Sequence, residues 1–428
     1  MNLVNGKIYE TDECEDILNG LESAVLNTLN GSFLNSEMII NACDRLVREL
    51  DETMYLAAMR ELGIDENLGK SYLSEAKQMF SGEALRYRLK TELGENYNKE
   101  NSYTPPFIEK TLTEKTVPLG VLLHVAAGNA DGLPAFSVLE GLLTGNVNIL
   151  KLPAAEGGIS VRLLLELIKI EPSLAPYIYV FDYSSKDIVH INKLIQVADA
   201  VVVWGGIEAV SAFRSLIPPN IKLIEWGHKI SFVYVTKQGM TKENLEGLAK
   251  NIIITGQLLC SSCQGIFIDS DDMKDINEFC ENFLPVLERT VIENIKHIDI
   301  GIKSQTALQL YCAELETIYT ENQIYRGKNC SLTAVKNMIL EPALPFGNAW
   351  VKPLPKAELL KNLRPYKNYL QTVGLLCGQD EKEQIADILF KTGVVRICSG
   401  ERMSATYCGA PHDGEYPLRR YTKLVCLE

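Results

Sequence analysis

Short, largely apolar runs alternate with helical segments between residues 117 and 226, and this alternation constrains the fold more than any other feature. The runs include VPLGVLLHV at 117–125, AVVVW at 200–204 and KLIEW at 222–226. A run such as AVVVW, with no polar residue at every second position, is typical of a strand that helices cover on both faces. The segments between the runs, such as ISVRLLLELIKI at 159–170, have helical spacing. We therefore predict a βαβ series that forms a doubly wound parallel sheet.

A second series of the same kind follows ISFVYVT at 230–236. Its apolar runs are QGIFIDS at 264–270, NAWVKPL at 348–354, LQTVGLLCG at 370–378 and VVRICS at 394–399. Helical segments separate them, and together they predict a second α/β domain.

The chain before residue 95 has a different, helical pattern. Apolar residues recur at steps of three and four across residues 36–63, which predicts one amphipathic helix with Ser36 at its start and Gly63 at its end. The consecutive prolines Pro105 and Pro106 bar a helix within residues 102–111, so we predict a boundary there.

Composition excludes several classes of partner. The formal net charge is −13, from 55 acidic against 42 basic side chains, and no basic run offers the concentrated positive surface that nucleic acid requires. The chain contains neither a secretory signal pattern at its start nor an apolar stretch near the roughly 20 residues of a membrane helix. Eleven scattered cysteines, an odd number, favour reduced thiols, so we expect a cytoplasmic protein without a membrane span.

A cysteine-rich turn is the first candidate site. GQLLCSSCQG at 256–265 lies between a predicted helix and the strand GIFIDS, where backbone N–H groups favour a reactive thiolate. A zinc site would need a second cysteine pair or spaced histidines, which the five histidines do not supply, so we expect no metal. A redox pair and a structural pair remain alternatives, and the turn alone does not decide between them.

Four further motifs precede this turn. Asn129 stands in a loop of small residues between strand and helix, where its carboxamide can donate to an oxyanion. Lys151 ends a strand, at the crevice where doubly wound sheets bind nucleotides. Gly205 and Gly206 form a turn that lets a phosphate approach backbone N–H groups. Glu225 lies at the end of the next strand. A glutamate at such a position acts as a general acid or base in some proteins and is only a solvated side chain in others.

The order of these motifs resembles that of the aldehyde dehydrogenase superfamily. The resemblance implies an aldehyde dehydrogenase-like α/β fold, with a Rossmann-type cofactor domain, a second α/β catalytic domain and an N-terminal helical region. It also implies that Cys260 is the nucleophile, that Asn129 supports the oxyanion and that Glu225 is a general base. Cys260 follows Glu225 by 35 residues, a separation that members of the superfamily show.

The same resemblance assigns the cofactor contacts. It implies that Lys151 meets the adenosine ribose and that Gly205 and Gly206, with Trp204 before them, face the pyrophosphate. The third residue after Lys151 is Ala154, where a carboxylate would repel a 2′-phosphate. This favours NADPH, with NADH still possible, because Glu156 lies close enough to substitute for that carboxylate.

Three segments are similar to the acyl-CoA reductase family of luciferase operons, known as LuxC: CSSCQ at 260–264, LQTVGL at 370–375 and HDGEYPL at 412–418. The likeness covers residues 100–428. Two residues, Leu258 and Leu259, separate Gln257 from Cys260, whereas the superfamily usually has one, and Cys263 stands where these reductases tend to have proline. His412, Asp413 and Gly414 lie in the last of these segments, and the sequence leaves two interpretations open: they line the site, or they build a turn, because Asp-Gly is a turn signal in any protein.

This family resemblance implies NAD(P)H-dependent reduction of an acyl thioester, on CoA or a carrier, to an aldehyde through a Cys260 thioester. It further implies an acyl ligase or transferase as partner, and a homo-oligomer. The alternatives are an aldehyde dehydrogenase that runs the chemistry in reverse and a catalytically silent thiol sensor on the same fold. The implied domains are a helical region at 1–105, a nucleotide-binding domain at 106–230, a catalytic domain at 231–395 and a C-terminal segment at 396–428. The helical region is expected to pack on the nucleotide-binding, or cofactor, domain. The C-terminal segment is expected to return to the cofactor domain or to an oligomer interface.

Overall fold

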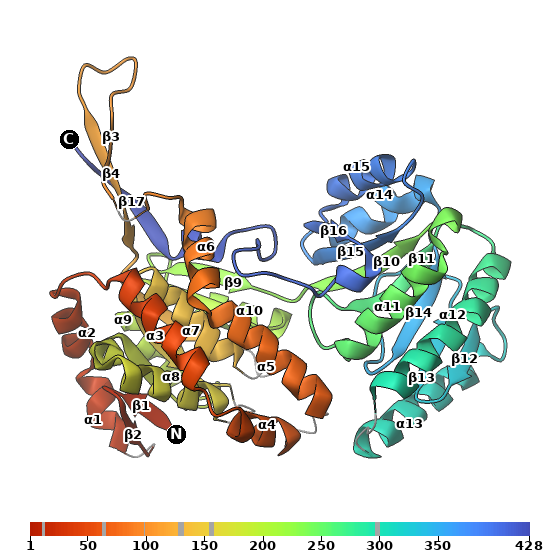
Figure 1. Ribbon diagram of the computed structural model, residues 1–428, viewed down its shortest axis with the longest axis horizontal. Helices are drawn as coiled ribbons and strands as arrows, with labels where there is room; N and C mark the ends of the chain where they lie inside the picture. The colour runs from red at the N-terminus through yellow and green to blue at the C-terminus, as the bar shows by residue number, and fades with distance from the viewer. Residues whose placement is uncertain (11–12, 62–65, 98, 127–131, 154–157, 296–299) are drawn as a thin grey trace. The chain divides into compact units, whose positions relative to one another are not determined.

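The computed structural model describes the whole chain except residues 11–12, 62–65, 98, 127–131, 154–157 and 296–299 (Figure 1). The chain divides into two compact units. The first contains Met1–Leu62, Gly69–Gly227 and Tyr407–Glu428, and the second contains Gly63–Leu68 and His228–Thr406. The helices predicted at the N-terminus and the predicted nucleotide-binding region therefore belong mainly to one unit.

The first unit is built on a seven-stranded sheet with strand order β2-β1-β7-β6-β5-β8-β9. The five strands from β7 to β9 are parallel, as the apolar runs predict, whereas β1 pairs antiparallel with both β7 and β2. The strands are β1 (Asn2–Val4), β2 (Lys7–Tyr9), β5 (Val121–Val125), β6 (Val147–Lys151), β7 (Ile178–Phe181), β8 (Ala200–Trp204) and β9 (Lys222–Trp226).

Helices bury both faces of this sheet. One face packs on α7 and α8, which α3 and α6 cover in turn, and the other face packs on α1, α2, α9 and α10. The helices of this unit are α1 (Cys14–Asn19), α2 (Leu21–Leu29), α3 (Ser36–Glu49), α4 (Glu52–Glu61), α5 (Glu66–Phe80), α6 (Gly82–Leu93), α7 (Leu133–Leu143), α8 (Ile159–Ile170), α9 (Ile188–Val197), α10 (Ile207–Leu216) and α16 (Pro417–Arg420).

The second unit repeats this architecture around a sheet of order β12-β13-β14-β11-β10-β15-β16, in which only β12 is antiparallel to its neighbour. One face packs on α11 and α12, and the other on α14 and α15. The elements are β10 (Ile230–Val235), α11 (Lys242–Ile254), β11 (Cys263–Ile268), α12 (Met273–Asn294), α13 (Ile300–Thr317), β12 (Gln323–Gly327), β13 (Cys330–Ala334), β14 (Asn348–Pro353), α14 (Leu359–Leu363), β15 (Leu370–Leu376), α15 (Lys382–Thr392) and β16 (Arg396–Cys398).

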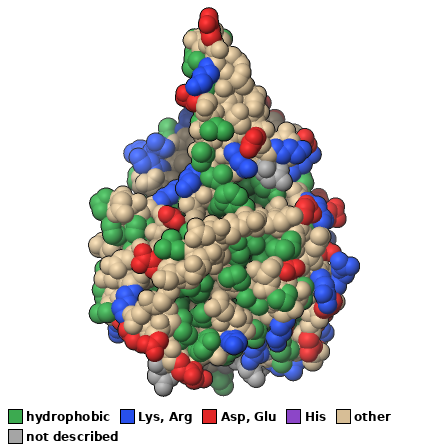
Figure 2. Space-filling model, turned by 90° about the vertical axis from the view of Figure 1, so that its left-hand side faces the viewer, with side chains coloured by type: hydrophobic (Ala, Val, Ile, Leu, Met, Phe, Trp, Pro, Cys, Tyr) green, Lys and Arg blue, Asp and Glu red, His purple; other side chains and the backbone are tan. Residues whose placement is uncertain are grey.

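A small antiparallel sheet completes the first unit. It contains β3 (Asn101–Tyr103), β4 (Leu112–Pro118) and β17 (Thr422–Leu427), in the order β17-β4-β3, and it projects from the helices of that unit (Figure 1). The last residues of the chain therefore pair along their whole length with the segment that follows the predicted proline boundary. On the face drawn in Figure 2, described Lys and Arg side chains are interspersed with Asp and Glu and form no continuous basic patch.

The N-terminal region differs from the prediction in three details. The single helix predicted across residues 36–63 is two helices, because Leu50 is extended with a ψ of 127° and ends α3 before α4 begins. The N-cap of α3 is Asn35, whose side chain accepts a hydrogen bond from the Glu37 N–H, and not Ser36. The short strands β1 and β2 were not predicted, since three-residue strands give too short a pattern to recognise.

A buried ionic network holds the C-terminal segment to the first unit. The Arg88 guanidinium on α6 donates to Glu92 at 2.6 Å and to Glu140 of α7 at 2.5 Å. Glu140 also accepts the Tyr421 hydroxyl at 3.1 Å, and Glu92 accepts the Leu418 N–H at 2.8 Å. All of these side chains are almost fully buried, so each charge depends on its partner.

We expect Arg88→Met to lower the free energy of unfolding by about 3 kcal/mol or more, because two buried carboxylates would lose their cation. Arg86→Met is the matched control on the same helix, since Arg86 pairs with Glu37 at the surface and the exposed pair contributes about 1 kcal/mol at most. Urea unfolding followed by circular dichroism measures both, and equal effects of the two substitutions would contradict the assignment.

His124 is a core residue of β5. Its ring nitrogens lie 2.7 Å from the Ser137 hydroxyl and 3.0 Å from the Asn148 side-chain oxygen, and its side chain is inaccessible to solvent. Burial lowers the pKa of His124 to about 4, because the charged imidazolium would be desolvated.

This shift predicts a pH dependence of stability. The unfolded chain, with a His pKa near 6.5, binds more protons than the folded chain between about pH 6.5 and 4, so stability is lost as the pH falls through that window. The expected loss is about 3 kcal/mol, and His124→Gln should lack this part of it. Urea midpoints at about pH 7 and about pH 4.5, with exposed His228→Gln as control, measure the difference.

Candidate functional site

Cys260 lies on a tight turn between α11 and β11 in the second unit. The turn is possible because Gly256 and Gln257 both have a positive φ, of 54° and 61°. Gln257 tolerates this left-handed conformation because its buried carboxamide accepts the N–H groups of Gly347 and Asn348 at 3.0 and 3.2 Å. The same carboxamide donates to the carbonyls of Cys263 and Asn348 at 3.0 and 2.7 Å. Gln257 is thus an anchor for the turn.

The Cys260 side chain is exposed, and its surroundings come from the first residues of two neighbouring strands. The Ser231 hydroxyl on β10 donates to the Cys260 carbonyl at 2.7 Å, and it accepts the Thr372 N–H of β15 at 3.0 Å. The Gln371 carboxamide of β15 donates an N–H to Cys260 Sγ at 3.1 Å. Leu258 and Leu259, the unusual pair before Cys260, are 51% and 39% exposed.

Cys263 has the opposite environment. It is the first residue of β11, it is fully buried, and its Sγ lies 3.4 Å from the Gly265 carbonyl. Burial raises the pKa of the Cys263 thiol, which keeps it protonated and unreactive. All eleven cysteines lie in the described part of the chain, and none is in a disulfide.

The remaining candidate residues that the structure describes belong to the first unit and share the carboxyl edge of its sheet. Lys151 is the last residue of β6, Trp204 is the last residue of β8, and Glu225 is the second-to-last residue of β9. Asn129, Ala154 and Glu156 lie outside the described residues. Cys260 belongs to the second unit.

The Lys151 amine donates to the Ser185 hydroxyl at 2.8 Å, although only 3% of the residue is exposed. Desolvation lowers the pKa of Lys151, and the nearby Asp182 opposes this shift. A buried amine at the end of a parallel strand suits a ligand hydroxyl or phosphate at the same edge.

Gly205 and Gly206 lead from β8 into α10 and have different surroundings. A Cβ on Gly205 would lie 3.0 Å from the Ala209 Cβ, which is tighter than an ordinary contact, so the turn packs closely against α10 there. A Cβ on Gly206 would meet no atom within 4 Å, and the φ of Gly206 is an ordinary −70°. The space beside Gly206 is open at the N-terminus of α10, which fits a cofactor phosphate that approaches the backbone N–H groups.

Trp204 belongs to an aromatic cluster at the same edge. Its indole N–H donates to the Ser137 hydroxyl at 3.1 Å, and its ring stacks on Trp226 with centroids 5.5 Å apart. The His412 ring contacts both indoles, at centroid distances of 5.2 and 5.1 Å. The sequence left open whether this segment lines the site or builds a turn. Asp413 and Gly414 form a turn with positive φ values of 51° and 82°, and this turn brings His412 to the ends of β8 and β9.

Glu225 forms an ion pair in this structure. Both carboxylate oxygens accept from Arg214 of α10, at 2.5 and 2.6 Å. The Arg214 side chain is 66% exposed and that of Glu225 is 25% exposed, so solvent weakens the pair.

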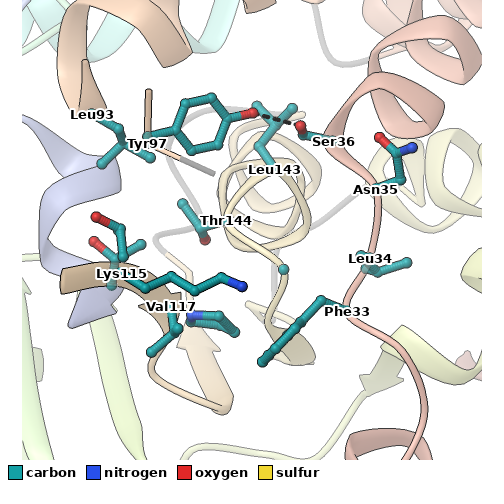
Figure 3. Close-up of a pocket in the computed structure, with 14 residues that line it drawn as sticks. Phe33, Leu34, Asn35, Ser36, Leu93, Tyr97, Lys115, Val117, Leu143 and Thr144 are labelled. Carbon is teal, nitrogen blue, oxygen red and sulfur yellow. Dashed lines mark hydrogen bonds between the residues drawn. The ribbon is translucent and has the colours of Figure 1, made fainter. Parts of the chain in front are cut away.

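A pocket of the first unit lies elsewhere, at the amino edge of the sheet. Its volume is about 300 Å³, and its wall includes Gly145 before β6 and Pro118 before β5. Figure 3 shows the Ser36–Tyr97 hydrogen bond on one side and the Lys115 side chain across from it. The pocket is therefore separate from the residues at the carboxyl edge.

Gln371 is the residue near Cys260 that sequence reasoning missed. It belongs to the LQTVGL segment, yet 111 positions separate it from Cys260, and no local pattern indicates that their side chains meet.

The described residues contain no group of three or more His, Cys, Asp or Glu side chains placed to hold a metal ion. None of the described helices has the length and hydropathy needed to cross a membrane.

Comparison with known proteins identifies the family. The family model "Acyl-CoA reductase (LuxC)" matches residues 34–424. The long-chain acyl-protein thioester reductase of Photobacterium phosphoreum is 23% identical over an alignment of 386 positions, which covers 86% of this chain and 75% of the relative. The long-chain acyl-protein thioester reductase 2 of Photobacterium leiognathi is 25% identical over an alignment of 333 positions, which covers 73% of this chain and 65% of the relative.

A solved structure shows the fold. A NAD-dependent benzaldehyde dehydrogenase from Corynebacterium glutamicum superposes with a TM-score of 0.73 at 12% identity, covering 100% of this chain and 94% of that one. The predicted aldehyde dehydrogenase-like fold and the predicted family resemblance are both confirmed. This chain therefore belongs to the acyl-CoA reductase (LuxC) family.

Proposed function

We propose that this protein reduces the acyl group of a thioester to an aldehyde with NADPH, or alternatively NADH, through a thioester on Cys260. The observation that carries the proposal is the exposed Cys260 on a turn anchored by hydrogen bonds, with an amide N–H directed at its sulfur. Such a thiol is accessible to an acyl group and has a donor that favours its reactive thiolate form.

In the first half of the reaction, the Cys260 thiolate attacks the acyl carbonyl and the carrier thiolate leaves. The Cys260 backbone N–H and, by family resemblance, the Asn129 carboxamide stabilise the tetrahedral oxyanion. The nicotinamide cofactor, when bound, supplies the hydride that reduces the enzyme thioester. The resulting hemithioacetal loses its hydroxyl proton, its C–S bond breaks to release the aldehyde, and the electron pair of that bond returns to Cys260.

Glu225 is proposed as the proton relay. Its carboxylate would first have to separate from Arg214. Because that ion pair is exposed to solvent, breaking it costs little free energy. The reverse, oxidative reaction uses the same groups, so the direction depends on the substrates supplied.

The carboxyl edge of the first sheet is the proposed cofactor site. Lys151 would contact the ribose, and the turn at Gly205 and Gly206, beside Trp204, would receive the pyrophosphate at the N-terminus of α10. The preference for NADPH rests on Ala154 in place of a carboxylate.

The relatives are named for long-chain acyl-protein thioesters, so we propose a fatty acyl group on CoA or on a carrier protein as the substrate, with an acyl transferase or ligase as the partner that supplies it. We further propose a cytoplasmic homo-oligomer. Leu424 and Leu427 on β17 are each 70% exposed, and such apolar side chains on a projecting sheet favour contact with a second copy.

The decisive experiment compares two cysteines three positions apart. Cys260→Ala should reduce acyl-CoA-dependent NADPH oxidation at least about 10³-fold, because it removes the nucleophile. Cys263→Ala should change the rate only a few-fold, because the Cys263 thiol is buried and protonated. The assay should include NADH and acyl-CoAs from short to long. Unchanged activity in Cys260→Ala would overturn the proposal, and activity only with an aldehyde and an oxidised cofactor would favour the reverse reaction.

Gly206→Ala tests the cofactor site. The added methyl group meets no protein atom, so the free energy of unfolding should fall by about 1 kcal/mol at most, the cost of alanine in place of glycine at an N-cap, but the methyl group would occupy the space proposed for a phosphate. We expect the Kd for NADPH to rise roughly tenfold or more, measured by titration of cofactor fluorescence. Gly20→Ala, at an exposed junction between α1 and α2, is the control. Equal cofactor affinity in both variants would place the phosphate elsewhere.

A further inference from the structure

We propose that Gln371 stabilises the negative charge on Cys260 Sγ and holds the sulfur in its attacking position. The inference rests on the proposed function of Cys260 and adds a residue to it. The Gln371 carboxamide nitrogen lies 3.1 Å from Sγ, within hydrogen-bond distance for sulfur, and only 7% of the residue is exposed.

Apart from Gln371 and Thr372, the residues of the strand that carries Gln371 are apolar. β15 has the sequence LQTVGLL and is buried along its whole length. A buried carboxamide in such a strand costs free energy unless its polar atoms are paired. A glutamine at this position therefore has a partner that justifies its burial, and one such partner is the sulfur of Cys260.

The pairing of β15 is irregular at this residue. Ile230 pairs with Leu370 and Phe232 pairs with Val373, so two steps along β10 correspond to three steps along β15. The additional residue falls at Gln371 or Thr372. Such irregularities are rare between parallel strands and redirect side chains from their regular alternation. Gln371, whose side chain contacts Cys260, thus lies where the regular pairing of β15 is interrupted.

Ser231 links the backbones that carry the two partners. Its hydroxyl bridges the Thr372 N–H, at 3.0 Å, and the Cys260 carbonyl, at 2.7 Å. The backbone next to Gln371 is thus linked through one side chain to the backbone of Cys260. The groups that face Cys260 from β10 and β15 in these contacts are a hydroxyl, a carboxamide and a backbone amide, none of which titrates in the physiological range.

The chemistry of this contact is electrostatic, and no proton is transferred from the amide. An N–H that points at sulfur favours the thiolate over the thiol, since the hydrogen bond to the charged acceptor is the stronger one. The same donor assists the last step, in which the C–S bond of the hemithioacetal breaks and the electron pair returns to Sγ.

The test measures the alkylation rate of Cys260 by iodoacetamide in the full chain without cofactor, with the modified peptide quantified by mass spectrometry. Gln371→Met keeps the length of the side chain and removes the donor, and we expect roughly tenfold slower alkylation. Gln371→Glu is isosteric and adds a negative charge next to the sulfur, so alkylation should be slower still. The control is Gln264→Met, because the Gln264 carboxamide bonds only to backbone groups of Gln257 and Ala343 in the contacts described.

Kinetics separate this role from a structural or cofactor-binding one. In the Gln371 variants kcat should fall while the KM for NADPH changes less than about twofold. Alkylation at the wild-type rate in both variants would overturn the proposal, as would a rise in the KM for NADPH as the sole effect. The alkylation result does not require turnover, so it stands apart from the Cys260→Ala assay that tests the proposed function.

Discussion

The burial of both faces of each parallel sheet is the constraint on which the arrangement of functional residues depends. The strands β5, β6, β8, β10 and β15 are buried along their entire length. Polar groups that must meet a ligand are therefore confined to strand ends and to the turns beside them. In the first unit these groups lie at the carboxyl ends of the strands, and in the second unit the Cys260 turn lies at the amino ends of β10, β11 and β15.

The two edges supply different chemistry. The carboxyl edge of the first sheet offers a helix N-terminus at Gly206 and a buried amine at Lys151, which suit anionic and hydroxylated ligands. The amino edge of the second sheet offers a turn held by Gln257 and a sulfur that accepts an N–H from Gln371. Two local features that would be costly elsewhere, a left-handed glutamine and an irregular parallel pairing, occur beside Cys260, the proposed nucleophile.

Prediction from sequence succeeded where a pattern is local and repeated. The runs at 200–204 and 370–378 have no polar alternation and became buried parallel strands. The prediction of one helix across 36–63 was wrong, because periodicity continues through Leu50 although the backbone there is extended. Ser36 resembled a cap, but Asn35 before it has the better geometry and accepts the Glu37 N–H.

The amino-acid sequence by itself determined the fold class, the family and the turn that carries Cys260, because these depend on apolar runs, turn residues and the order of short motifs. Tertiary structure alone decided that Cys260 is exposed while Cys263 is buried, that His412 packs on Trp204, and that Gln371 reaches a sulfur 111 positions away. The physical reason is that burial and side-chain contacts arise when sheets and helices pack together. Residues distant in the chain then become neighbours, and the spacing of residues along the sequence does not indicate such contacts.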